Sequence, residues 1–339
     1  MRTSRMPPPN DRGAVKDDSR WLAAAASLAA RARPESRPNP AVGAIIVKDG
    51  AVAGRGWTQT GGRPHAEALA LEAAGEAAIG ATLYVTLEPC AHESERGPAC
   101  ADLVSASRLA RVVIGCKDPD LRTAGDGMAR IAAAGIDVEL SPSPEAEASL
   151  AGYLMLRGKG RPEVTLKLAT SLDGCIALAG GESQWITGEL ARAHCHAMRA
   201  RSDAILVGGG TLRSDNPRLD VRLPGLEDRS PERWVLTGDE APRGWRALPS
   251  PHAITGMADI QYLFVEGGAE TAAAFLAEGL VDRLLIYRAP IVIGGGKACI
   301  GDIGLHSLSE AHGQWHLSDC RQLGSDVLEV YERKPCSLA

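Results

Sequence analysis

Short apolar runs alternate with amphipathic stretches along the first half of the chain, and polar, proline- or glycine-rich segments separate them. The β-branched runs predict strands, and the alanine-rich or periodic stretches predict helices. Strands are expected at 42–47, 51–56, 82–86, 111–115 and 136–140, and helices at 20–33, 65–78, 98–107 and 127–134. Strands that alternate with helices predict a mainly parallel sheet covered on both faces.

The same α/β pattern restarts near residue 164, with no sequence repeat between the halves. Strands are expected at 164–169, 204–208, 233–237, 262–266 and 283–289, and helices at 187–201 and 271–278. We therefore expect two α/β domains. They are residues 17–145 and 163–339, with a one-helix linker at 146–162 and a disordered polar arm at 1–16. Ser19 is expected to cap the first helix.

Composition narrows the class of partner. The 339 residues carry a net charge of -5 and only 4% aromatic side chains. Neither value suits a nucleic-acid partner, which requires a basic surface or stacking platforms. We expect a small-molecule substrate instead.

The cellular location of the protein is predicted from three features that the sequence lacks: a signal-peptide core, a membrane-spanning length and the cysteine spacing of a disulfide framework. The segment 1–18 has no apolar core typical of a signal peptide, and 21–32 is too short to cross a membrane. The eight cysteines lack the spacing of a disulfide framework, which indicates a reducing compartment. We therefore expect a cytoplasmic protein with no membrane partner.

His65, Glu67, Cys90 and Cys100 form the most specific chemical pattern. Three protein ligands, His65, Cys90 and Cys100, suit a catalytic zinc that keeps a fourth position open. A histidine, a glutamate two residues later and a Pro-Cys pair are typical of zinc nucleobase deaminases, although here ten positions separate the cysteines. Glu67 is predicted to carry protons. A structural zinc or unrelated buried cysteines remain the alternatives.

The other cysteines stand alone among apolar or loop residues and are expected to be inert. They are Cys116, Cys175, Cys195, Cys299, Cys320 and Cys336.

Two glycine-rich stretches, 204–211 and 262–274, follow predicted strands in the second half. Small residues before a helix can cradle a phosphate, but on this pattern alone each is equally an ordinary tight turn.

Taken together, the chain from residue 21 onward resembles the bifunctional riboflavin-biosynthesis proteins, in which a pyrimidine deaminase is fused to a pyrimidine reductase. In the first half the resemblance is carried by residues 38–43, 64–67, 86–92 and 97–100. In the second half it is carried by 166–167, 171–174, 181–187, 210–217, 265–268 and 294–296.

The resemblance implies a cytidine-deaminase-like three-layer domain followed by a dihydrofolate-reductase-like domain. It implies two consecutive reactions on a phosphorylated pyrimidine. Zinc-dependent hydrolysis removes an amino group from a diaminopyrimidinone carrying ribose 5-phosphate, and NADPH then reduces the ribosyl group to ribityl. A homo-oligomer, dimer or tetramer, is also expected.

Site residues follow by motif from the same resemblance. In the deaminase, Asn39 and His92 are expected to contact substrate. In the reductase, the expected substrate contacts are Ser183, Arg199, Leu219, Arg222 and Glu266, and the two arginines suit a phosphate. The expected NADPH contacts are Ala169, Trp185, Thr211, Asp215, Gly268, Ala269, Glu270 and Thr271. Lys167 and Asp173 are plausible site residues without an assigned role.

Three departures from the family pattern stand out. Thr58 replaces a histidine found near the pocket in many members, and the loop from Cys90 to Cys100 is one residue longer than in the family pattern. Only residues 238–261 separate two reductase strands, where the family has an additional strand and helix. We therefore expect part of the cofactor-binding sheet edge to be missing, and we hypothesise that reduction is weakened or lost while deamination is kept.

Three other functions stay open. The second half can be a degenerate binding or dimerisation module behind an active deaminase. The chain can be a nucleic-acid base deaminase of the tRNA type with an unrelated appendage, or a non-enzymatic scaffold stabilised by zinc.

Overall fold

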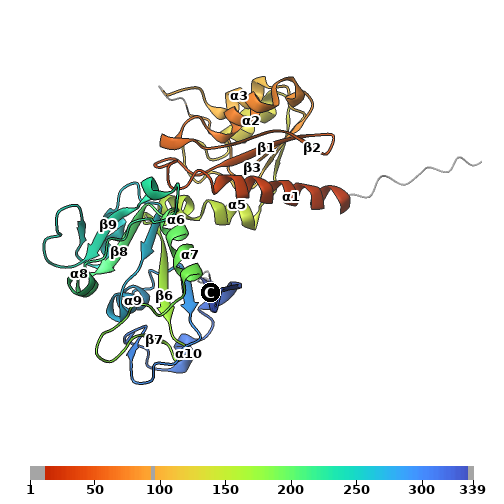
Figure 1. Cartoon of the computed structure of the whole chain (residues 1–339). Coiled ribbons are helices and arrows are strands. Elements are labelled where there is room, and N and C mark those ends of the chain that lie inside the picture. Colours follow the sequence, from red (N-terminus) through yellow and green to blue (C-terminus); the bar gives the residue numbers. More distant parts are fainter. Residues whose placement is uncertain (1–11, 93–95, 335–339) are drawn as a thin grey trace, which may run out of the picture. The chain divides into compact units, whose positions relative to one another are not determined.

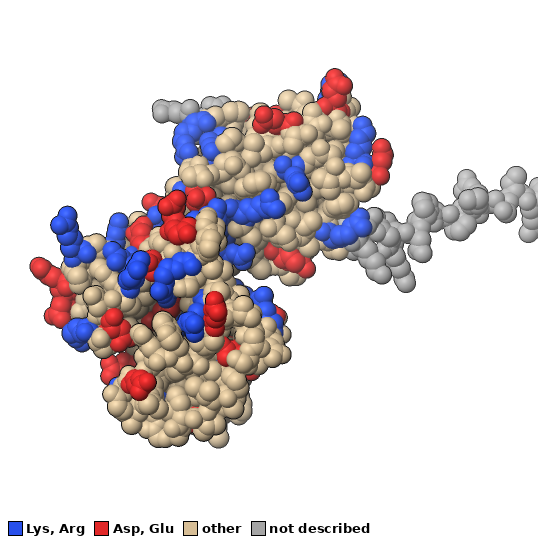
Figure 2. Space-filling view, viewed as in Figure 1, with Lys and Arg blue, Asp and Glu red and all other residues tan. Residues whose placement is uncertain are grey.

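The computed structural model describes residues 12–92 and 96–334. The chain divides into two compact units, Met1–Gly158 and Lys159–Ala339, and each has its own sheet (Figure 1). Among the described residues, no helix combines the length and apolar character needed to cross a membrane. On the face shown in Figure 2, acidic and basic side chains are interspersed.

The centre of unit 1 is a five-stranded sheet. Its strands are β1 (Gly43–Lys48), β2 (Ala51–Trp57), β3 (Thr82–Val85), β4 (Arg111–Ile114) and β5 (Asp137–Leu140), in the order β2-β1-β3-β4-β5. The strands predicted at 42–47 and 51–56 form a β1–β2 hairpin, and Asp49 and Gly50 turn it with positive φ angles of 52° and 76°. Because β1 is antiparallel to both neighbours, only β3, β4 and β5 are parallel to one another.

Helices cover both faces of this sheet, as the sequence pattern predicted (Figure 1). One layer contains α2 (Ala66–Ala74), α3 (Cys100–Ala106) and α4 (Asp126–Ala133), and the other contains α1 (Arg12–Ala29) and α5 (Pro144–Ser149). Strand β1 contributes side chains to two hydrophobic cores, one on each face of the sheet. Ala44 and Ile46 pack with α2, whereas Ile45 and Val47 pack with α1. The alternation follows from the period of two along a strand.

The start of α1 corrects a prediction. The helix begins at Arg12, so Ser19 lies inside it, and residues 12–16 of the expected disordered arm are helical. Residues 1–11 lie outside the described part of the chain. Long-range contacts explain the earlier start, because the buried Asp18 accepts hydrogen bonds from the Tyr84 hydroxyl and the Arg111 guanidinium, both at 2.8 Å.

The segment 146–162, expected as a linker with one helix, contains parts of two helices, α5 and α6 (Ala151–Lys159). Leu150 and Tyr153 belong to the core of unit 1. These residues are therefore packed rather than extended, because their apolar side chains join the same core cluster as residues of α2, α3 and α4.

Replacing Gly43 with alanine is expected to destabilise unit 1 by about 1–3 kcal/mol, because overpacking a core forces the backbone to move. A Cβ atom at this position would lie 1.9 Å from the Ala25 carbonyl oxygen of α1. Urea unfolding measures the effect. Gly158→Ala is the control, because a Cβ there meets no atom within 4 Å, and this variant should be no less stable than the wild type. Equal stability of the two variants would contradict the prediction.

Unit 2 has an eight-stranded sheet in the order β10-β9-β8-β11-β6-β12-β15-β14. The strands from β10 to β12 in this order are parallel, and β15 and β14 are antiparallel additions. The strands are β6 (Glu163–Thr170), β8 (Ala204–Gly208), β9 (Glu232–Leu236), β10 (Arg246–Leu248), β11 (Tyr262–Val265), β12 (Arg283–Arg288), β14 (Trp315–Leu323) and β15 (Asp326–Arg333). The predicted parallel arrangement is confirmed for its first six strands.

Helices α7 (Glu189–Arg199) and α9 (Ala269–Ala277) match the two helices predicted in this half. Further short elements have no clear sequence pattern. They are β7 (Cys175–Ala177), α8 (Gly209–Asp215), β13 (Lys297–Ala298) and α10 (Leu308–Ala311). Strands β14 and β15 were also missed. The edge strand β14 exposes most of its residues and has no apolar run, whereas β15 has an alternating pattern that the sequence reading did not use.

The segment 238–261 corrects the expectation of a missing sheet edge. Strand β10 pairs in parallel with β9, and the 3-10 helix η4 (Pro251–Gly256) follows it. Leu248, Ile254 and Met257 from this segment are buried in the core of unit 2. Strand β10 has no recognisable sequence pattern, because it is only three residues long and only Leu248 of the three is buried.

Candidate active sites

Three sulfur and nitrogen donors meet in unit 1. His65 Nδ1 lies 3.1 Å from Cys100 Sγ and 3.6 Å from Cys90 Sγ, and the donor atoms all lie within 4.8 Å of one another. Both cysteines are buried. One imidazole nitrogen and two thiols fit a zinc ion with an open fourth position.

Local structure places these ligands. His65 is the residue immediately before α2, Cys100 is the first residue of α3, and Cys90 follows the end of β3. The Cys100 N–H donates to Cys90 Sγ at 3.3 Å. The hydrogen bond from the Cys100 thiol lowers the pKa of Cys90, which favours the thiolate form that binds a metal.

Glu67 lies in the first turn of α2, beside the ligands, and is 3% exposed. Burial raises the pKa of its carboxyl group. A carboxyl group whose pKa is raised binds a proton more readily, and a general acid–base residue must both accept and return one.

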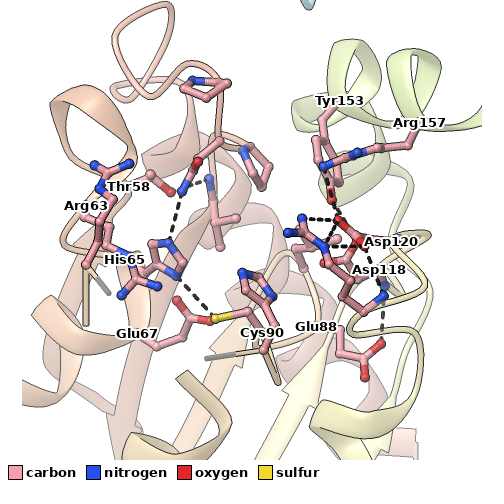
Figure 3. A pocket seen from close by; sticks show the side chains of 18 residues that line it. Thr58, Arg63, His65, Glu67, Glu88, Cys90, Asp118, Asp120, Tyr153 and Arg157 are labelled. Atoms are coloured by element: carbon pink, nitrogen blue, oxygen red, sulfur yellow. Dashed lines mark hydrogen bonds and ion pairs between the residues drawn. The ribbon is translucent and has the colours of Figure 1, made fainter. Parts of the chain in front are cut away.

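His65, Glu67 and Cys90 line one end of a pocket of about 180 Å³ (Figure 3). Asn39 and His92, both predicted as substrate contacts, also line it. The Asn39 amide nitrogen lies 3.2 Å from His65 Nε2. Within the described residues, His92 Nδ1 is buried without a hydrogen-bond partner. Thr58 lines the pocket as well, but its hydroxyl accepts the Val42 N–H at 3.0 Å.

Sequence reasoning missed the far wall of this pocket. Asp118, Asp120 and Arg122 follow β4, and Tyr153 and Arg157 extend from α6 (Figure 3). The Tyr153 hydroxyl donates to Asp118 at 2.9 Å, and Asp120 pairs with Arg122 at 2.6 Å and Arg157 at 3.1 Å. The only available signal was a charged, proline-bearing stretch after a strand, which is also typical of ordinary loops.

Unit 2 contains a larger pocket of about 530 Å³. Most residues predicted for the reductase line it. They are Ala169, Ser183, Trp185, Arg199, Thr211, Asp215, Leu219, Arg222, Glu266 and Gly268.

Strand and helix periods bring these side chains to the pocket. Along β6, Leu166 and Leu168 face the core, so Lys167 and Ala169 face the other side of the sheet, where they line the pocket. Along α7, Ala191, Cys195 and Arg199 recur every four residues on the buried face.

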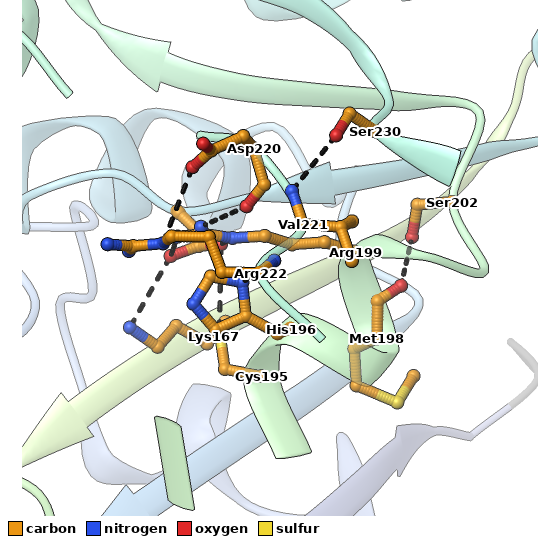
Figure 4. A network of polar contacts seen from close by, with 11 residues as sticks. Lys167, Cys195, His196, Met198, Arg199, Ser202, Asp220, Val221, Arg222 and Ser230 are labelled. Atoms are coloured by element: carbon orange, nitrogen blue, oxygen red, sulfur yellow. Dashed lines mark hydrogen bonds and ion pairs between the residues drawn. The ribbon is translucent and has the colours of Figure 1, made fainter. Parts of the chain in front are cut away.

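A buried ion network forms the floor of the pocket (Figure 4). Arg199 donates to both carboxylate oxygens of Glu266 at 2.5 and 3.0 Å, and Lys167 Nζ lies 3.6 Å from the same carboxylate. Burial opposes the charge on Glu266, but Lys167 and Arg199 lower its pKa to about 2. The carboxylate therefore stays ionised.

Arg199 is thus engaged inside the protein. Its third donor, Nη1, binds the Asp220 carbonyl oxygen at 3.0 Å. By contrast, the Arg222 side chain is 53% exposed at the pocket and contacts only the Asp220 carboxylate, at 3.4 Å, among the described side chains. Cys195 lies on the same network, and burial raises the pKa of its thiol to about 12, so it is neutral.

Three predicted cofactor residues do not line the pocket. Ala269, Glu270 and Thr271 form the first turn of α9. Thr271 is instead packed between the two glycine-rich stretches, because a Cβ on Gly208 or Gly267 would lie 2.2 or 2.4 Å from its side chain. These glycines are required for close packing of helix and strand ends.

Asp173, which had no assigned role, holds a neighbouring loop. Its carboxylate accepts hydrogen bonds from the Ser171 hydroxyl and from the N–H groups of Ile293 and Gly294. Gly294 belongs to the 294–296 glycine run of the sequence pattern.

Comparison with known proteins identifies the family of each unit. The family described as "Cytidine and deoxycytidylate deaminase zinc-binding region" matches residues 15–116, and "RibD C-terminal domain" matches 162–248 and 253–328. The riboflavin biosynthesis protein RibD of Escherichia coli is 38% identical, covering 91% of this chain and 98% of that protein. RibD of Aquifex aeolicus is 34% identical, covering 93% and 98%.

Solved structures agree over the whole chain. Acinetobacter baumannii RibD has a TM-score of 0.84 and 34% identity, covering 95% of this chain and 100% of that one. A Thermotoga maritima protein, titled a diaminohydroxyphosphoribosylaminopyrimidine deaminase/5-amino-6-(5-phosphoribosylamino)uracil reductase, has a TM-score of 0.82 and 29% identity over 95% and 100%.

These matches correct the alternatives left open by the sequence. Relatives that span both units, together with the C-terminal family match, contradict a deaminase with a degenerate appendage. They equally contradict a nucleic-acid base deaminase and a scaffold without activity. The chain belongs to the RibD family of bifunctional riboflavin-biosynthesis enzymes, in which a zinc-binding deaminase domain precedes an NADPH-dependent reductase domain.

Proposed function

We propose that this chain deaminates a diaminohydroxyphosphoribosylaminopyrimidine and then reduces the resulting 5-amino-6-(5-phosphoribosylamino)uracil with NADPH. The observation that carries the proposal is the His65, Cys90 and Cys100 cluster beside the buried Glu67, in a chain that also has the reductase pocket. The first reaction releases ammonia, and the second adds a hydride and a proton to the ribosyl group.

In the deaminase, His65, Cys90 and Cys100 would hold zinc. Zinc, when bound, lowers the pKa of a water molecule at the open coordination position. Glu67 would accept one proton from the attacking water and pass it to the ring nitrogen, and would then accept a second proton from the added hydroxyl group and pass it to the amine, which leaves as ammonia. Asn39 and His92 would contact the pyrimidine from the pocket wall.

In the reductase, different residues of the pocket would bind the cofactor and the substrate. Ala169, Trp185, Thr211, Asp215 and Gly268 would contact NADPH. Ser183 and Leu219 would contact the substrate, and Arg222 would bind its phosphate because this guanidinium reaches the pocket with most of its donors free. Arg199 and Glu266 would form the charged floor beneath it. The completed β10 edge gives no structural reason for the reductase to be weak.

A cytoplasmic location and a homo-oligomeric state are also proposed. The seven cysteines in the described residues are free thiols, which supports a reducing compartment. The oligomeric state has no direct support in a single chain and stays a prediction for gel filtration with light scattering.

The proposal is tested by following ammonia and NADPH separately with the purified chain. With the diaminopyrimidine nucleotide and no NADPH, we expect ammonia release alone. When NADPH is then added, we expect it to be oxidised. With the deaminated uracil nucleotide, we expect NADPH oxidation and no ammonia. Ammonia release with no NADPH oxidation in either assay would contradict the bifunctional proposal.

A further inference from the structure

Glu88 is a buried carboxylate of unit 1 that lies two residues before Cys90 and is 2% exposed. It accepts hydrogen bonds from three backbone N–H groups, those of Gly125 at 2.9 and 3.1 Å, Met128 at 3.2 Å and Asp118 at 3.3 Å. Among the described residues, no lysine or arginine forms an ion pair with it. Backbone dipoles therefore compensate its charge.

The donors belong to one structural feature, the loop from β4 to α4 and the first turn of α4. This loop carries Asp118, Asp120 and Arg122, which form the far wall of the deaminase pocket. Free N–H groups at the start of a helix favour a carboxylate. Glu88 therefore attaches the far wall to the turn that follows β3.

A second contact brings the same two segments together. A Cβ on Gly127, in the first turn of α4, would lie 2.1 Å from the Pro89 carbonyl oxygen and 3.2 Å from the Glu88 carboxylate. The helix start thus packs directly on the Glu88–Pro89 turn. Only a glycine permits this approach, which places the three N–H groups within reach of Glu88.

Separate backbone hydrogen bonds hold the proposed zinc ligand Cys90 in place. Its carbonyl oxygen accepts the Ala101 N–H at 3.0 Å, and its sulfur accepts the Cys100 N–H at 3.3 Å. The Asp118 N–H, by contrast, has Glu88 as its acceptor. Loss of the Glu88 carboxylate should therefore disturb the pocket wall before it disturbs the metal ligands.

We propose that Glu88 is a positioning residue that holds the Asp118–Arg122 wall in place and so sets the affinity of the deaminase pocket for its pyrimidine nucleotide. It takes no part in zinc binding or proton transfer. This inference rests on the proposed deaminase function.

The test is Glu88→Gln in the full-length zinc-loaded chain. Glutamine keeps the size but turns an NH2 group toward backbone donors, which leaves buried N–H groups unsatisfied. We expect KM for deamination to rise about tenfold or more, with kcat within about threefold of wild type. Zinc should stay at one per chain, and the reductase step should not change. Amide hydrogen exchange over residues 117–129 should become faster.

Glu76→Gln is the matched control, because this glutamate is exposed on the surface of unit 1. It should leave KM, zinc content and hydrogen exchange at their wild-type values. If E88Q does not accumulate as folded protein, Glu88→Asp is measured in the same way. It keeps the charge but withdraws the carboxylate, so a smaller rise in KM is expected.

The outcomes separate this inference from the proposed function. A wild-type chain that releases no ammonia refutes the deaminase proposal, and hydrogen exchange alone then decides whether Glu88 orders the wall. With an active wild type, an unchanged KM in the Glu88 variants overturns the inference. Loss of zinc in proportion to activity also overturns it, because Glu88 would then support the ligands.

Discussion

Replacing Glu67 with glutamine is expected to lower kcat for ammonia release about 10²–10⁴-fold, the usual contribution of a general acid–base residue. Glutamine has nearly the same shape and fits the buried position, but it cannot accept or return a proton. The zinc ligands His65, Cys90 and Cys100 are unchanged, so the metal content should stay at one zinc per chain. Ammonia assays and elemental analysis measure the two quantities.

The reductase provides an internal control for this variant. With the deaminated uracil nucleotide, E67Q should oxidise NADPH at the wild-type rate, because the reductase pocket belongs to unit 2 and Glu67 to unit 1. Cys90→Ser, in comparison, should lose zinc and deamination together. Ammonia release by E67Q at the wild-type rate would remove Glu67 from the mechanism.

Replacing Glu266 with glutamine is expected to destabilise unit 2 by about 3–5 kcal/mol, since loss of one partner leaves buried charges without compensation. Arg199 and Lys167 both depend on this carboxylate, and the side chains of Arg199 and Glu266 are 11% and 9% exposed. NADPH-dependent reduction should also fall, because Arg199 and Lys167 lose the carboxylate that holds them at the pocket floor. Deamination should continue.

Urea titration of the two activities measures this effect. The urea concentration that abolishes reduction should fall, and the one that abolishes ammonia release should not. Glu329→Gln is the matched control, because its partner Arg288 is 39% exposed and such ion pairs contribute about 0–1 kcal/mol. If E266Q and E329Q unfold at the same urea concentration, the network is not a structural centre of the reductase.

Sequence patterns located most of the elements because these patterns are local. The apolar runs of β1, β3, β4, β8 and β11 are buried strands, and helices α2, α3, α4, α7 and α9 lie where the sequence pattern placed them. Two edge strands, β10 and β14, were missed. Strands β10 and β14 bury few side chains, so their hydrogen bonds to a neighbour define them and no apolar pattern does.

The deaminase centre was predictable for a similar reason. His65 and Glu67 lie in one helical turn, and a strand end and a helix start place Cys90 and Cys100. Short spacings thus specify the donor types and their order. The residues of the opposite pocket wall were not predictable. The hydrogen bond between Tyr153 and Asp118 joins residues that are 35 positions apart in the sequence, and it depends on the packing of α6.

Local sequence patterns were enough to predict the candidate zinc ligands, the candidate acid–base glutamate and the succession of two α/β units, because each depends on neighbouring residues and a fixed period. The use of the long charged side chains depends on packing between distant segments. Arg199 and Arg222 read alike as phosphate ligands, yet Arg199 is paired with Glu266, 67 residues away, and Arg222 is at the open pocket. An arginine binds whichever carboxylate the sheet and helix packing bring within reach, and that choice has no local sequence signal.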